Sequence, residues 1–119
     1  MDYRKTDPAF MERAERFAFE EVPAEEGQQL DAPTRWLAAN CFGDYYTRTG
    51  LDLAQREMIT FCFLMAQGGC EPQLIAHAKG NMNLGNDKAF LVRVVSQCLP
   101  YIGYPRSLNA ITCINKAAE

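Results

Sequence analysis

The 119-residue sequence predicts an all-α protein, a compact bundle of about six helices. Apolar residues recur at intervals of three and four through most of the chain, which is the spacing of one helix face. Short joints that contain glycine, proline or asparagine separate these periodic segments. No segment alternates between apolar and polar residues in the way that a half-buried strand does. Joints this short place consecutive helices side by side and antiparallel.

The composition indicates one soluble globular domain over residues 1–119. Apolar residues make up 48% of the chain and charged residues 23%, which is typical of folded domains and unlike disordered ones. A net charge of -3 argues against a nucleic-acid partner, because phosphate binding needs clustered Lys and Arg. The sequence shows no basic amphipathic face, no apolar run long enough to span a bilayer and no apolar leader. We therefore expect a cytoplasmic protein with no membrane partner.

The N-terminal segment predicts a helix followed by a linker. Asp7 is a preferred capping residue and Pro8 fits the first helical position. This helix is expected to end near Pro23, and the residues from there to Leu30 are polar. Residues 1–30 are therefore interpreted as a helical arm and linker attached to the domain.

A second helix is predicted over residues 31–49, with a stop at Gly50. Its apolar face includes Trp36, Leu37, Cys41 and Tyr45. The third helix is expected to start at a capping box formed by Asp52 and Gln55. It is apolar nearly all round between residues 58 and 65, so we expect it at the centre of a bundle or of an oligomer.

A break at Gly68-Gly69 ends the third helix, and Pro72 lies in the first turn of the fourth. The fourth helix is expected to continue to about Met82. Asn86 or Asp87 can cap the fifth helix, whose inner face includes Phe90, Leu91, Val94, Val95 and Cys98.

Pro100 and Gly103 are expected to break the fifth helix, since proline lacks the N–H that a helix interior needs. Pro105 then starts a sixth helix. The apolar residues predicted for its inner face are Leu108, Ile111 and Ile114.

Five cysteines are present, an odd number, and no two of them form a Cys-x-x-Cys pair. This pattern favours reduced thiols over a disulfide framework or a zinc site, so we predict no metal site. Cys62, Cys98 and Cys113 lie in apolar helical patterns and are interpreted as small buried hydrophobic residues, as is Cys41.

Glu57 is the first candidate for a functional residue. It shares a helix face with Phe61 and Leu64, and a carboxylate in apolar surroundings is costly unless it is paired or protonated. The alternative is that Glu57 lies close enough to the helix start to reach solvent and interact with the helix dipole.

His77, the only histidine in the chain, is the second candidate. If the helices fold back on each other at Gly68-Gly69, Glu57 and His77 lie within roughly one turn of the same level, at ~1.5 Å of rise per residue. A carboxylate partner orients an imidazole for proton transfer near neutral pH. The alternative is a structural or surface histidine.

Cys70 is the third candidate, because it follows two glycines and opens a helix, where the thiolate is favoured. The alternative is a capping or packing residue. Arg56, Lys79 and Arg106 are cations that can attract an anionic substrate, and solvated surface charge is the alternative for each of them.

The segment REMITFCFLMAQGGCEPQLIAHAKGNMNLG, followed by the fifth helix and YIGYPRSLNAI, resembles the carboxymuconolactone decarboxylase-like family, which includes the alkylhydroperoxidase D group. The resemblance covers roughly Trp36 to Asn115. It rests on the elements REM, GGC, H and YxGxP in this order. It implies an alkylhydroperoxidase D-like helical fold whose subunits assemble into homotrimers or homohexamers.

The peroxidase branch of the family implies one set of roles for these residues. That branch uses Cys-x-x-Cys-x-x-x-His, with two thiols in a disulfide cycle and a glutamate and a histidine that move protons. Cys70 and His77 match the first cysteine and the histidine, whereas Gln73 replaces the second cysteine. A one-cysteine peroxidase of peroxiredoxin type, an antioxidant that uses Cys70 with an external thiol or a distant cysteine, is the alternative function.

The decarboxylase branch implies a cofactor-free reaction on a small anionic lactone, with His77 as the acid and Glu57 orienting it. A nearby Arg or a helix N-terminus would hold the anion. This chemistry tolerates the loss of a cysteine, so it is the first hypothesis, with catalytic residues Glu57 and His77 and with Cys70 conditional. No cofactor is expected, and the expected partner is a small-molecule substrate. An oligomeric, non-catalytic binding protein for small molecules is the second alternative.

Overall fold

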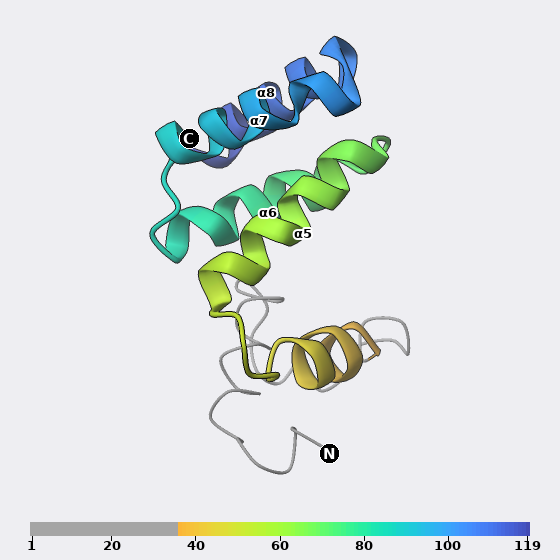
Figure 1. Ribbon diagram of the computed structural model, residues 1–119, viewed down its shortest axis with the longest axis vertical. Helices are drawn as coiled ribbons and strands as arrows, with labels where there is room; N and C mark the ends of the chain where they lie inside the picture. Colours follow the sequence, from red (N-terminus) through yellow and green to blue (C-terminus); the bar gives the residue numbers. More distant parts are fainter. Residues whose placement is uncertain (1–35) are drawn as a thin grey trace. The chain divides into compact units, whose positions relative to one another are not determined.

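The computed structural model describes residues 36–119, so the arm and linker predicted for residues 1–30 lie outside the described part of the chain. Figure 1 shows the elements of this part, which are helices without strands. In chain order they are η1 (Leu37–Tyr45), α5 (Leu53–Gln67), α6 (Glu71–Asn83), α7 (Lys88–Ile102) and α8 (Tyr104–Ala117). The all-helical class is confirmed for residues 36–119. The chain divides into two units, Met1–Leu51 and Asp52–Glu119.

In the first unit, η1 is a π-helix, and the Tyr46 N–H donates to the Cys41 carbonyl five residues earlier at 3.1 Å. Phe42 is buried, and its ring centroid lies 5.0 Å from that of Tyr46. The helix ends at Tyr45 rather than at Gly50. The predicted apolar face is wrong, because Trp36, Leu37 and Tyr45 are exposed and the buried residues are Ala38, Phe42 and Gly43. The five-residue hydrogen-bond spacing of a π-helix turns successive side chains to different faces than α-helical spacing does.

In the second unit, α5 begins at the predicted capping box. The Asp52 carboxylate accepts from the Gln55 backbone N–H at 2.7 Å, and the Gln55 side-chain oxygen accepts from the Asp52 N–H at 3.0 Å. The helix ends at Gly68, whose φ of 72° is one that residues with a Cβ rarely adopt. One stripe of α5 is buried, formed by Glu57, Phe61 and Met65.

Helices α6 and α7 also begin where the sequence predicted. Pro72 lies in the first turn of α6, and the Asp87 side chain accepts from the Phe90 N–H at 2.8 Å to cap α7. The predicted break at Pro100 is wrong, because α7 continues through it to Ile102 and ends at Gly103. Pro100 is exposed and close to the helix end, so solvent reaches the carbonyl that loses its partner.

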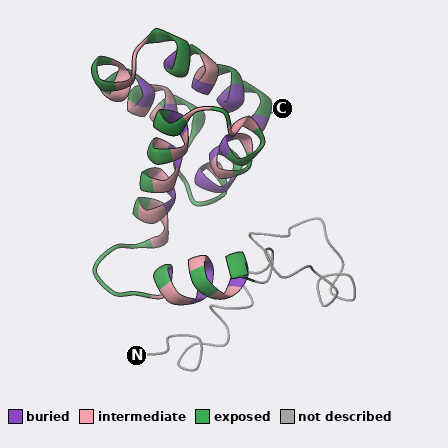
Figure 2. Ribbon diagram, turned by 90° about the vertical axis from the view of Figure 1, so that its right-hand side faces the viewer, coloured by how far each residue is buried: buried purple, intermediate pink, exposed green. Residues whose placement is uncertain are grey.

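Helices α5 to α8 enclose one hydrophobic core. Helix α6 packs against both α5 and α8, and α7 packs against α8. Figure 2 shows the buried side of each helix turned toward the others. The fully buried side chains of this core include Phe61, Met65, Leu74, Leu91 and Ile114.

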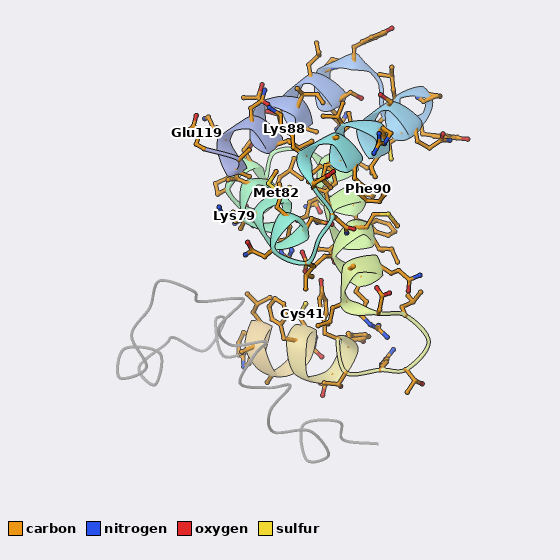
Figure 3. All side chains as sticks on the ribbon, turned by 90° about the vertical axis from the view of Figure 1, so that its left-hand side faces the viewer. Cys41, Lys79, Met82, Lys88, Phe90 and Glu119 are labelled. Carbon is orange, nitrogen blue, oxygen red and sulfur yellow. The ribbon has the colours of Figure 1, made fainter. Side chains whose placement is uncertain are left out.

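Met82 and Phe90 are partly buried against this core, whereas Lys79 and Lys88 are exposed (Figure 3). Leu108, predicted for the inner face of the last helix, is 63% exposed instead. The buried stripe of α8 runs through Ser107, Ala110 and Ile114, because the small side chains of the first two allow close packing against α6 and α7. No helix between residues 36 and 119 is long and apolar enough to cross a membrane.

Candidate active site

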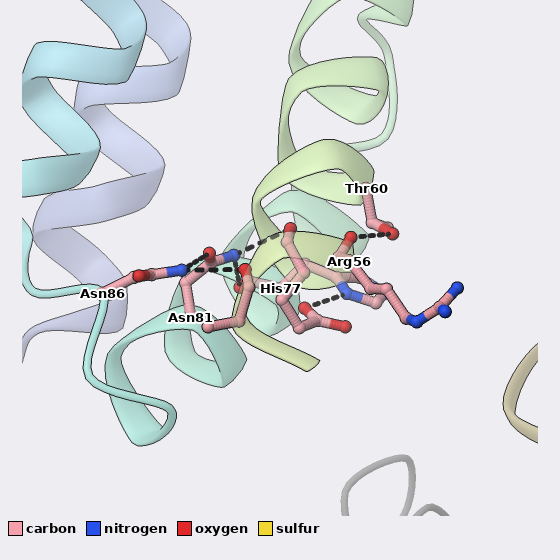
Figure 4. A network of polar contacts seen from close by, with 7 residues as sticks. Arg56, Thr60, His77, Asn81 and Asn86 are labelled. Carbon is pink, nitrogen blue, oxygen red and sulfur yellow. Dashed lines mark hydrogen bonds and ion pairs between the residues drawn. The ribbon is translucent and has the colours of Figure 1, made fainter. Parts of the chain in front are cut away.

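Glu57 and His77 meet between α5 and α6. Glu57 Oε2 lies 2.8 Å from His77 Nδ1. The Glu57 side chain is 1% exposed and that of His77 is 17% exposed. The solvated alternative for Glu57 is therefore wrong, because α6 covers its face of α5. A buried carboxylate beside a partly exposed imidazole forms a polar pair in which the histidine is the more accessible partner (Figure 4).

The turn at Gly68-Gly69 sets the level at which the two side chains meet. Both glycines have φ of 72°, and the chain reverses there within three residues, from Gln67 to Glu71. α5 and α6 therefore run back along each other, and the predicted pairing of Glu57 with His77 is confirmed by the contact between them.

Asn81 holds the backbone around this pair. It is fully buried, and its side-chain amide donates to the backbone carbonyl of Glu57 at 3.0 Å and to that of His77 at 2.7 Å. The Asn81 side-chain oxygen accepts from the amide of Asn86 at 2.9 Å, and Asn86 also donates to the Ala54 carbonyl at 3.0 Å. The two asparagines thus connect both helices and the turn before α7 at the level of the pair (Figure 4).

Cys70 is not part of this contact network. It is the residue before α6, about two turns or roughly 10 Å before His77 along the helix axis. Its thiol donates to the Leu64 carbonyl at 3.3 Å, which fixes the side chain at the Gly68-Gly69 turn. The structure therefore brings together two of the three predicted site residues, Glu57 and His77, and leaves Cys70 at the start of α6.

The candidate cations occupy different places. Arg106 lies against Gly68, because a Cβ added to Gly68 would be 3.0 Å from the Nε of Arg106. Arg106 is therefore near Cys70 rather than near His77. Arg56 is adjacent to Glu57 in sequence, and its side chain extends away from Asn81 and Asn86 (Figure 4). Among residues 36–119, no group of three or more His, Cys, Asp or Glu side chains is placed to hold a metal ion.

Comparison with known protein families identifies the chain. The family model described as the carboxymuconolactone decarboxylase family matches residues 31–116. The protein belongs to the carboxymuconolactone decarboxylase family. A search of curated protein sequences found no significant match.

Membership of the carboxymuconolactone decarboxylase family makes the position of Gln73 informative. Gln73 is exposed in the first turn of α6, one turn after Cys70. Cys113 of α8, which is buried, interacts electrostatically with Cys70. Burial raises the pKa of Cys113, and the negative charge of Glu71 raises it further; Lys116 lowers it, and Cys70 adds the smallest rise.

Sequence reasoning did not find Asn81, Asn86 or the proximity of Cys113 to Cys70. Asn81 lies one turn after His77 on the same face, so its position was a usable signal for a second polar residue at the site. Cys113 is separated from Cys70 by two whole helices along the chain, α6 and α7, and no local pattern links them.

Proposed function

We propose that this protein is a cofactor-free decarboxylase-like enzyme that acts on a small anionic lactone or a related acid. The observation that carries the proposal is the 2.8 Å contact between His77 Nδ1 and a carboxylate that is almost fully buried. Burying a carboxylate is costly unless the carboxylate has a partner. A common role for a buried carboxylate is to orient an imidazole for proton transfer. Membership of the carboxymuconolactone decarboxylase family supports the same chemistry.

In the proposed reaction, the bond between the substrate carboxylate and its carbon breaks and carbon dioxide leaves. The bonding electron pair moves onto the conjugated ring carbonyl and forms an enolate. Protonated His77 then gives a proton to the carbon that lost the carboxylate, and it regains a proton from solvent. Since Glu57 holds Nδ1, the transfer atom is Nε2, and Glu57 stabilises the positive charge of the imidazolium.

A thiol-dependent peroxidase that uses Cys70 is the second candidate. The position of Cys70 at the start of α6 favours it, because the helix dipole stabilises a thiolate there. A non-catalytic, oligomeric protein that binds a small molecule is the third.

The test is carbon dioxide release from a panel of small anionic lactones by the wild type, His77→Ala and Cys70→Ser. His77→Ala is expected to lower kcat/KM by a factor of about 10² to 10⁴, the usual contribution of a general acid. Cys70→Ser is expected to retain decarboxylation, because its thiol lies roughly 10 Å along α6 from His77.

The same variants separate the three candidates. Hydroperoxide consumption that depends on Cys70, without carbon dioxide release, would contradict the proposal and favour the peroxidase. Hydroperoxide consumption that survives Cys70→Ser excludes the Cys70 mechanism. A protein that turns over neither substrate but retains a lactone on equilibrium dialysis is a binding protein.

A further inference from the structure

Two cysteines from different helices of the second unit lie together. Cys62 is on α5 and Cys98 is on α7, and their Sγ atoms are 3.9 Å apart. Both residues pack against the hydrophobic core, and both are partly rather than fully buried. The interpretation of these two cysteines as small buried hydrophobic residues is therefore incomplete, because both are only partly buried and the packing of α5 against α7 makes them a pair.

The Cys62 thiol of this pair holds its proton firmly. Burial raises the pKa of Cys62 to about 12, with further contributions from the negative charge of Cys98 and from the hydrogen bond between the two thiols. Cys62 therefore stays protonated near neutral pH. A thiol that keeps its proton is a poor nucleophile, which leaves Cys98 as the attacking sulfur of the pair.

We propose that Cys62 and Cys98 form a redox-active dithiol that closes to an intramolecular disulfide on reaction with a hydroperoxide. The Cys98 thiolate attacks the peroxide oxygen, the O–O bond breaks, and the departing oxygen takes up a proton to leave as an alcohol or as water. The sulfenic acid left on Cys98 is then attacked by the Cys62 sulfur. The S–O bond breaks, and its hydroxyl leaves as water with the Cys62 proton. The two cysteines lose two electrons, and the hydroperoxide gains them.

The geometry suits this step. The sulfur atoms have to approach from 3.9 Å to about 2.05 Å, the length of a disulfide bond. The partial exposure of both residues allows a small oxidant to reach them and a small thiol to reduce the product. The disulfide would covalently join α7 to α5, the helix that carries Glu57.

This dithiol is separate from the residues of the proposed decarboxylase. It uses neither His77 nor Cys70, and it does not need a cysteine at position 73. Its failure would leave the role of His77 untouched, and loss of decarboxylation in His77→Ala would leave the dithiol untouched.

The test is to treat the reduced full-length protein with hydrogen peroxide, block the remaining thiols with an alkylating agent and map the disulfides by mass spectrometry. Tryptic cleavage gives peptide 57–79, which holds Cys62 and Cys70, peptide 94–106, which holds Cys98, and peptide 107–116, which holds Cys113. We expect a cross-link between peptides 57–79 and 94–106 that dithiothreitol reverses. Cys70→Ser removes the ambiguity in the first peptide and is expected to keep the cross-link, whereas Cys62→Ser and Cys98→Ser are expected to abolish it.

Three outcomes would overturn the proposal. One is a wild-type protein in which peroxide oxidises thiols without linking 57–79 to 94–106. Another is a cross-link that disappears in Cys70→Ser, and the third is a cross-link from 57–79 to 107–116 in its place. The first and third need only the wild type, so the proposal stays testable if a variant fails to fold.

The order of the two steps has its own readout. Dimedone, which traps sulfenic acids, is expected to label Cys98 in Cys62→Ser and to leave Cys62 unlabelled in Cys98→Ser. Labelling of Cys62 with Cys98 left unlabelled in these variants would overturn the assignment of Cys98 as the nucleophile.

Discussion

At the scale of single residues, Asn81 has an unusual share of the contacts around the candidate site. One buried amide group satisfies a carbonyl on α5 and a carbonyl on α6, and its oxygen accepts from the α6–α7 turn. The two carbonyls belong to Glu57 and His77 themselves. Asn81 therefore positions the backbone of both members of the pair.

Asn81→Ala is expected to lower the free energy of unfolding by about 1–3 kcal/mol. The physical reason is that the buried side chain loses its hydrogen bonds to the two carbonyls and to Asn86, and losing buried hydrogen bonds costs about this much. Chemical denaturation in urea measures the effect. The matched control is Asn83→Ala on the same helix, where the side chain is exposed and the expected change is within about 0.5 kcal/mol. Equal changes in the two variants would show that the Asn81 contacts do not stabilise the fold.

At the scale of single elements, the start of α5 is defined by side-chain chemistry as well as by packing. The capping box at Asp52 and Gln55 satisfies two backbone N–H groups that a helix start leaves without helical partners. Glu57 lies in the second turn after this cap. The capping box therefore fixes where α5 begins, and with it the position of Glu57 relative to the turn at Gly68-Gly69.

Asp52→Ala is expected to reduce stability by about 0.5–2 kcal/mol, the usual cost of losing an N-cap side chain. Thermal or urea denaturation followed by circular dichroism measures it. Asp52→Asn is the matched control, because asparagine caps helices about as well as aspartate and should recover most of the loss. A loss of the same size in both variants would point to the charge of Asp52 rather than to its hydrogen bond.

At the scale of the whole molecule, the second unit leaves large apolar side chains on its surface. Phe63 of α5 is 72% exposed, and it is accompanied on α5, α7 and α8 by Ile59, Tyr101, Tyr104 and Leu108. α5 was expected at the centre of a bundle or of an oligomer because it is apolar nearly all round. The described residues 36–119 bury only one stripe of it, so we propose that the outer face of α5 is covered by further copies of this chain in a homotrimer or homohexamer.

Phe63→Asp is expected to shift the protein toward a smaller species, because a carboxylate in an apolar interface has no partner. Light scattering coupled to size exclusion at micromolar concentration gives the mass of the species. Ser96→Asp, which introduces the same charge at an exposed polar position of α7, is the control and is expected to leave the mass unchanged. A wild type that is monomeric at micromolar concentration would contradict the assembly.

The sequence by itself determined the features that depend on local chemistry. Capping residues at Asp52 and Asp87, glycine at the Gly68-Gly69 turn and apolar spacing of three and four act over one or two turns of chain, so the helices and most of their ends were predictable. The level of Glu57 and His77 followed from the same information. It needs only the position of one turn and the rise of a helix.

Only the tertiary structure decided which faces of the helices meet. The burial of Glu57, the network through Asn81 and Asn86 and the 3.9 Å approach of Cys62 to Cys98 all depend on the rotation of one helix about its axis relative to another. Periodicity defines an apolar stripe on each helix but does not say which stripe of a neighbour it packs against. For this reason the Glu57–His77 pair could be predicted from the sequence. The two asparagines that hold this pair, and the proximity of Cys62 to Cys98, could not.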